Sequence, residues 1–303
     1  MGKVMTSGGA VGKQSLIFAA IAAAAIAGAT VFPIGSEARA ETGAWAESAH
    51  AKARLVSAVA ATGARRVQLG LEISLEPGWK TYWRAPGEGG MPPRFDWSGS
   101  ANLANVDIAW PAPKAFEIGG LESVGYADHV ILPLDVGLAN TGEPLALRLS
   151  LQYAVCREIC MLVEAKLSLD LPGPAQQTSE SLTNAAAIAQ FQARVPRPGA
   201  ELGWRIAGTT RKTVGEGADR REVIVIDVAN AGSPFGAPAM LFESPGLRFG
   251  KSMLRPAPDG AQARFVAAMR GAATAPGGGD LLLTLIDGDR AGTFTVRMEP
   301  SAR

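Results

Sequence analysis

Cys156 and Cys160 are the only cysteines of the chain, and a pair this close in sequence can form a small disulfide that opens and closes easily. Exchange begins when a thiolate attacks a disulfide sulfur, so one cysteine should be accessible with a lowered pKa and the other should resolve the mixed disulfide. The charge of Arg157 favours a thiolate, although Glu158 opposes it. From these residues alone, either cysteine is a candidate nucleophile.

Alternating sequences flank the two cysteines. Apolar and polar residues alternate over 147–155 and again over 165–171. This period of two predicts two half-buried strands. The segment between them is long enough only for a connection, so the sequence predicts a β-hairpin with both sulfurs at one sheet edge, within bonding distance.

The first forty residues resemble an export signal in their composition. Lys3 and Lys13 precede an uncharged stretch over 14–36, and Ala38-Arg39-Ala40 provides a site with small residues at the cleavage positions. The pattern is typical of a secretory signal peptide, and its apolar span is also long enough for an uncleaved membrane anchor. Either outcome delivers residues 41–303 to a compartment where disulfides persist.

The charge of the exported part is close to neutral. Removing residues 1–40 takes away three basic residues and one acidic residue, so the formal charge changes from +1 to −1. This balance gives no indication of a nucleic-acid partner or of an anionic membrane surface as a partner. Residues 41–303 are enough for two domains of ordinary size.

Short apolar segments separated by glycine and proline predict an all-β fold. Strands are expected at 67–75, 106–109, 130–136, 147–155 and 165–171, and then at 203–207, 223–228, 239–243, 263–268, 281–286 and 293–298. Between the two groups, Ser179 is expected to cap a short helix that ends before Pro196. We predict two immunoglobulin-like β-sandwich domains, 41–175 and 199–303, joined by a helical linker over 176–198.

Several ordered motifs then indicate a family. They are PGWKTYWRAPG at 77–87, MPP at 91–93, WPAP at 110–113, GY at 125–126, LP at 132–133 and VCREIC at 155–160. Over roughly residues 50–172 the sequence resembles the N-terminal periplasmic domain of DsbD-type protein-disulfide reductases, and among them the variants linked to suppression of copper sensitivity. The resemblance implies a periplasmic location and a cysteine pair that passes electrons to oxidised periplasmic proteins of the thioredoxin-like class.

The resemblance also implies roles for individual residues. Cys160 corresponds to the attacking cysteine of relatives, and Tyr82 to an aromatic residue near the pair. Phe116 and Tyr126 are the candidates for an aromatic cap over the cysteines, and Arg157 is a supporting residue. This sequence lacks the membrane domain and the thioredoxin-like domain of full-length members, which implies a protein-disulfide reductase component that depends on a separate membrane-embedded thiol reductase.

Two other interpretations are open. The disulfide would be static in a non-catalytic binding module, although a ring this small stabilises by only about 2 kcal/mol, against nearly 5 for a ring of about a hundred residues. Alternatively, both thiolates with Met161, and His129 if the loops converge, would make a soft copper(I) site. Packing is the commoner role for Met161 and a surface position for His129, and no cysteine or histidine motif supports a metal site. We therefore expect no metal and no cofactor.

Overall fold

The structure is a computed structural model that describes residues 41–59, 62–87, 89–173, 178–216, 220–257, 260–270 and 279–298. The expected signal peptide or anchor over 1–40 lies outside these residues. Within the described part of the chain, no helix has both the length and the apolar character needed to cross a membrane.

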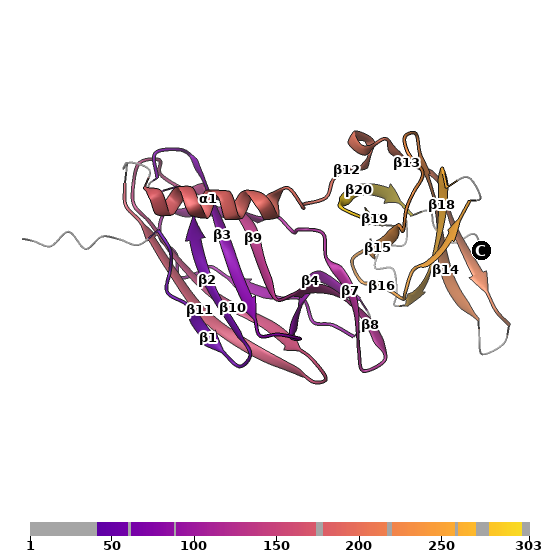
Figure 1. Ribbon diagram of the computed structural model, residues 1–303, viewed down its shortest axis with the longest axis horizontal. Coiled ribbons are helices and arrows are strands. Elements are labelled where there is room, and N and C mark those ends of the chain that lie inside the picture. Colours follow the sequence, from indigo (N-terminus) through magenta and orange to yellow (C-terminus); the bar gives the residue numbers. More distant parts are fainter. Residues whose placement is uncertain are drawn as a thin grey trace, which may run out of the picture. The chain divides into compact units, whose positions relative to one another are not determined.

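Two antiparallel sheets form the first sandwich (Figure 1). One contains, in spatial order, β1 (Ala46–Ser48), β2 (Ala51–Ser57), β3 (Arg66–Leu75), β9 (His129–Leu138) and β6 (Leu103–Ile108). The other contains β11 (Cys160–Leu171), β10 (Leu145–Cys156), β4 (Lys80–Gly87), β8 (Leu121–Ala127) and β7 (Lys114–Ile118), with β5 (Arg94–Asp96) paired to β10.

The core of this sandwich follows from the alternation seen in the sequence. In β10 the inward side chains from Leu145 to Val155 are almost fully buried, and the facing positions of β3 and β9 are buried as well. Successive side chains of a strand point to opposite faces, so a period of two places one apolar row inside. Removing these side chains from water is the main favourable contribution to folding.

Helix α1 (Ser179–Gln192) follows the first sandwich and contacts β9, β3 and β2 (Figure 1). Its buried residues Ile188 and Phe191 pack on that sheet. Gly70 makes space for Ile188, because a Cβ on residue 70 would lie 3.0 Å from the Ile188 side chain. The N-cap is Thr178 rather than the expected Ser179. The Thr178 side chain accepts the N–H of Ser181 in a capping box, which satisfies a free donor of the first turn.

A second pair of sheets follows the helix and a 3-10 turn, η1 (Gly199–Leu202). One sheet contains β12 (Arg197–Pro198), β20 (Arg290–Arg297), β19 (Asp280–Asp287) and β15 (Ala239–Glu243). The other contains β13 (Trp204–Val214), β14 (Arg221–Asn230), β18 (Gln262–Arg270) and β16 (Arg248–Phe249), with β17 (Met253–Pro256) paired to β18. Trp204, Phe265 and Leu283 are central to its core. The predicted all-β fold of two sandwiches with a helical connection is confirmed.

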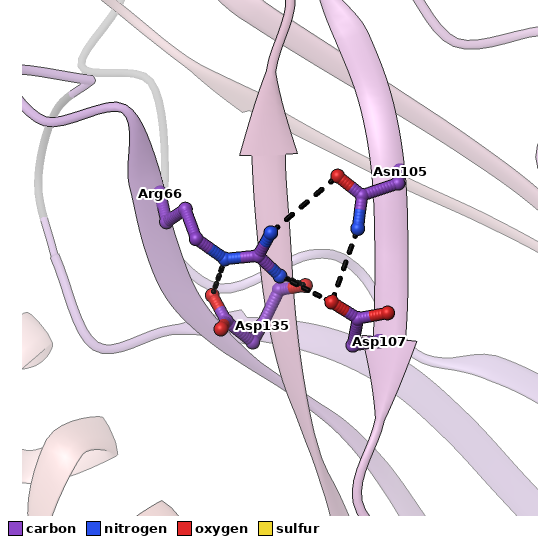
Figure 2. A network of polar contacts seen from close by, with 4 residues as sticks. All are labelled: Arg66, Asn105, Asp107 and Asp135. Carbon is purple, nitrogen blue, oxygen red and sulfur yellow. Dashed lines mark hydrogen bonds and ion pairs between the residues drawn. The ribbon is translucent and has the colours of Figure 1, made fainter.

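A polar network covers part of the outer surface of the β3-β9-β6 sheet (Figure 2). Arg66 contacts Asp135 at 2.8 Å and Asp107 at 2.5 Å, and Asn105 donates to Asp107 at 3.1 Å. The network therefore joins three neighbouring strands and ties β6 to the sheet. Because its groups are exposed, solvent screens these ion pairs and they contribute little to stability.

Candidate functional site

The two cysteines lie at the end of the β10–β11 hairpin and form a disulfide. The antiparallel register places Cys156 directly opposite Cys160, and their Cα atoms are 4.1 Å apart. Residues 157–159 close the turn, with the N–H of Arg157 donating to the carbonyl of Ile159 at 3.1 Å. The alternation that predicted this hairpin thus leads to a bonded pair of sulfurs at the edge of the second sheet.

The two cysteines differ in exposure. Cys156 is 0% exposed because β10 is covered on its other side by β4, where Lys80 is its cross-strand partner. Cys160 begins the edge strand β11 and is exposed. An attacking thiolate needs access to the sulfur that it attacks. Cys160 is therefore the sulfur that a partner can reach, and Cys156 is its shielded counterpart.

The hydroxyl of Tyr82 lies between the two sulfurs. Its Oη is 3.1 Å from Sγ of Cys160 and 3.2 Å from Sγ of Cys156. Neither sulfur of a disulfide carries a hydrogen, so the phenol is the donor. Burial raises the pKa of Tyr82, and a smaller effect of the Ser123 hydroxyl lowers it. The phenol therefore keeps its proton at neutral pH and can donate it in a hydrogen bond.

Tyr82 belongs to a small apolar cluster on the outer face of the second sheet, separate from the core between the sheets. Its buried members are Tyr82, Ala154 and Cys156, and Phe116 packs against it. Thr81, which points the other way, donates from Oγ1 to the carbonyl of Ala154 at 2.9 Å and fixes β4 to β10. The position of the phenol over the sulfurs is thus determined by strand pairing on both sides.

The two candidates for an aromatic cap lie in different places. Both are in the β7–β8 hairpin, Phe116 in β7 and Tyr126 in β8. The ring of Phe116 stacks on that of Tyr82 with centroids 6.0 Å apart, so Phe116 covers the cluster. Tyr126 lies in the main core and donates to the carbonyl of Pro111 at 2.8 Å, and burial raises its pKa. The structure brings only Phe116 to the cysteines.

Two basic residues lie near the hairpin tip. Arg157 is exposed, and its aliphatic carbons come within 3.4 Å of the position that a Cβ on Gly78 would occupy. Lys80, which the sequence analysis missed, lies opposite Cys156 in register, so the two share a face. A nearby cation stabilises a thiolate. The signal for Lys80 was its position two residues before Tyr82, which puts both on the same side of β4.

Two exposed apolar side chains lie close to Cys160 in the chain. Ile159 is 66% exposed in the turn, and Leu162 is 59% exposed on the same face of β11 as Cys160. Other outward positions of β11 are polar, namely Glu164, Lys166 and Ser168. Leu162 is therefore an apolar exception among the outward positions of β11, next to the disulfide, and the sequence of the strand shows this exception. Such a patch is typical of a surface that contacts another protein.

The residues considered for copper do not gather at the sulfurs. Met161 alternates to the inner face of β11 and packs against the main core. His129 lies on β9 and hydrogen-bonds to Glu72 at 2.9 Å. In the described residues, no three side chains of histidine, cysteine, aspartate or glutamate form a group that could hold a metal ion.

Comparison with known proteins adds two findings. Residues 51–172 match the family profile described as "Thiol:disulfide interchange protein DsbD, N-terminal". Among solved structures, the chain is similar to the N-terminal periplasmic domain of ScsB from Proteus mirabilis, at 24% sequence identity and a TM-score of 0.67, over 86% of this chain and 99% of that chain. At this identity the likeness concerns the fold, and its extent includes strands of both sandwiches. No curated protein matches the chain.

Proposed function

We propose that this chain, whose residues 51–172 are a DsbD N-terminal-type domain, is a periplasmic thiol–disulfide exchange protein. It receives electrons from a membrane-embedded thiol reductase and passes them to oxidised thioredoxin-like proteins. One observation carries the proposal: an exposed cysteine is bonded to a fully buried one, and a buried phenol lies within hydrogen-bonding distance of both sulfurs.

Reduction of the disulfide begins at Cys160. A thiolate of the donor attacks Sγ of Cys160, a bond forms between these sulfurs, and the Cys156–Cys160 bond breaks. The electron pair of the broken bond leaves on Sγ of Cys156, and the hydroxyl of Tyr82 donates a hydrogen bond to that thiolate. The second thiolate of the donor then attacks its own partner sulfur in the mixed disulfide, which releases Cys160 and leaves the donor as a disulfide. The pair has gained two electrons, and two protons enter from solvent.

Transfer to a client reverses these roles. The Cys160 thiolate attacks a disulfide of the client and forms a mixed disulfide. Cys156 then attacks Sγ of Cys160, restores the intramolecular disulfide and releases the client as a dithiol. Lys80 and Tyr82 favour the thiolate forms through charge and hydrogen bonding, and so raise the fraction of reactive thiolate.

The decisive experiment is the reduction potential of the Cys156–Cys160 pair. The full chain is equilibrated in glutathione or dithiothreitol redox buffers, and free thiols are then alkylated and counted by mass spectrometry. We expect a potential between about −180 and −270 mV, the range of exchange-active proteins. A potential below about −300 mV would identify a static bond and support the binding-module interpretation instead.

A further inference from the structure

Ser123 is a buried polar residue in the apolar surroundings of Tyr82. It lies in β8 and is 1% exposed, and its cross-strand partner is Phe116, whose ring stacks on that of Tyr82. Within the described residues, the Ser123 hydroxyl has no partner at regular hydrogen-bonding geometry. A buried hydroxyl without such a partner lowers the stability of a fold. Its presence at this position therefore calls for a reason other than stability.

The strand register places Ser123 and Tyr82 on the same face. Tyr82 is directly opposite Gly125. Within β8, Val124 and Tyr126 point into the main core, so Ser123 and Gly125 point outward with Tyr82. Beyond Tyr82 the register of β4 shifts, and Ser123 is paired with Gly87. Gly125 has no side chain, and a Cβ there would lie 1.9 Å from the carbonyl oxygen of Thr81. The position between the serine and the phenol is therefore free of a side chain.

The Ser123 hydroxyl also affects the protonation of Tyr82. Burial raises the pKa of Tyr82, and hydrogen bonding with Ser123 lowers it. A hydroxyl stabilises a phenolate by donating to its oxygen. The same donation makes a neutral phenol a stronger donor, because hydrogen bonds in a chain polarise one another.

We propose that Ser123 is a positioning residue that donates a hydrogen bond to Oη of Tyr82 while the Tyr82 hydroxyl donates to the Cys156 thiolate. The phenol has one hydrogen, directed to sulfur, and its lone pairs remain free to accept the serine hydrogen. Ser123 touches neither sulfur and acts only through Tyr82. The inference rests on the proposed function, because the thiolate that it serves is the leaving group of disulfide exchange.

A double-mutant cycle tests the proposal. The oxidised full chain carrying Ser123→Ala, Tyr82→Phe or both is reduced by dithiothreitol over a range of pH, and the rate constant is referred to the concentration of dithiothreitol thiolate. We expect Ser123→Ala to slow reduction by about two- to tenfold, which corresponds to the usual contribution of one hydrogen bond. In the Tyr82→Phe background, Ser123→Ala should cause no further slowing.

A spectroscopic readout separates positioning from a purely structural role. In a Cys160→Ala background, where Cys156 is the remaining thiol, the ultraviolet absorbance of the thiolate should show a higher titration midpoint with Ser123→Ala than without it. Thermal unfolding of the oxidised protein should show a midpoint equal to or above that of the unmodified protein, because in the disulfide form the Ser123 hydroxyl has no partner at regular hydrogen-bonding geometry. The matched control is Thr284→Val in β19. Thr284 is 0% exposed, its hydroxyl also lacks a partner among the described residues, and it lies in the second sandwich. Its reduction rate should be unchanged.

The outcomes are distinguishable. Equal slowing by Ser123→Ala in both backgrounds would overturn the proposal, since the serine would then act independently of Tyr82. An unchanged rate in the single variant would overturn it as well. In either case an exchange-active potential for the pair leaves the proposed function intact. If dithiothreitol fails to reduce the unmodified disulfide, both the proposed function and this inference are wrong.

Discussion

The two sandwiches differ in what their outer faces carry. In each, a core of apolar side chains fills the space between two sheets. The first sandwich has an additional apolar cluster outside its core, around Tyr82, Ala154 and Cys156. Among the described residues, the second sandwich has only its core cluster. Apolar side chains on an outer face do not help to close a sandwich, so we propose that the additional cluster marks the face on which the first sandwich acts.

The long hairpins of the two sandwiches show a related difference. β10 and β11 pair over twelve consecutive positions, from Leu145 opposite Leu171 to Cys156 opposite Cys160. β13 and β14 are of similar length, but their register shifts between Ile206 and Gly208. A slip of one residue turns side chains to the other face of a sheet. The unbroken register of the first hairpin is therefore what holds two sulfurs opposite each other on the outer face.

The largest expected effect tests the difference between the two cysteines. In Cys156→Ala the exposed Cys160 remains, and we expect it to form a stable mixed disulfide with a thioredoxin-like protein, because the resolving sulfur is gone. In Cys160→Ala the remaining thiol is buried, and we expect no mixed disulfide. The probe is a thioredoxin variant that keeps only its attacking cysteine, activated as a mixed disulfide with thionitrobenzoate, which is the leaving group when Cys160 attacks. Non-reducing gels and mass spectrometry of the cross-linked species measure both variants. Equal trapping by the two variants would contradict the assignment of Cys160 as the reactive sulfur.

A smaller effect is expected from the apolar patch beside the disulfide. Leu162→Ser should lower kcat/KM for exchange with thioredoxin by about three- to tenfold, because a half-buried leucine contributes about 1 kcal/mol to a protein contact. The rate with dithiothreitol should stay the same, since a small reductant makes no contact with the patch. Stopped-flow fluorescence of thioredoxin gives the first rate, and alkylation of free thiols followed by mass spectrometry gives the rate with dithiothreitol.

The second sandwich offers the matched control for this variant. Met253 is 51% exposed in β17, so Met253→Ser removes a comparable exposed apolar side chain without approaching the cysteines. We expect it to leave both rates unchanged. If the two variants lowered the thioredoxin rate equally, the first outer face would have no special role in contacting partners.

The sequence was sufficient to predict the elements with local patterns. Alternation located β10 and β11, and short apolar segments separated by turn residues located β3, β9, β14, β15, β18 and β19. The short connection between Cys156 and Cys160 then determined the hairpin, because no other structure fits between two strands so close together. These features depend on neighbours in the chain, which is why the sequence shows them.

The surroundings of the sulfurs were harder to predict because they depend on strands that are distant in sequence. Lys80 and Tyr82 approach the cysteines only through the pairing of β4 with β10, and Phe116 only through the pairing of β7 with β8. Neither β7 nor β8 has a simple alternating pattern. The sequence therefore did not distinguish Phe116 from Tyr126, whereas their strands direct Phe116 to the outer face and Tyr126 to the core.

The smallest expected effect concerns an ion pair near the helix. Glu72 accepts hydrogen bonds from His129 at 2.9 Å and Arg54 at 2.6 Å, on the sheet that α1 covers. Burial raises the pKa of Glu72, but these hydrogen bonds and charges outweigh it, and the pKa falls below its ordinary value of 4.5. Its charged form therefore stabilises the first sandwich above pH 4.5, and this contribution is lost as the pH falls through the lowered pKa.

Substitution of Glu72 should make this contribution visible. Glu72→Gln is expected to lower the free energy of unfolding by about 1 kcal/mol at neutral pH, the usual value of a partly buried charged hydrogen bond. In acid, where Glu72 is protonated in both states, the difference should vanish. Urea denaturation at a series of pH values provides the comparison.

The control is an ion pair in the second sandwich. The pair of Asp227 with Arg264 is more exposed than that of Glu72 with Arg54, and solvent screens it. Asp227→Asn should therefore change the free energy of unfolding less at every pH. If Glu72→Gln lowered the free energy of unfolding by the same amount at every pH, the substitution would have caused a packing defect. The charge of Glu72 would then not distinguish the first sandwich from the second.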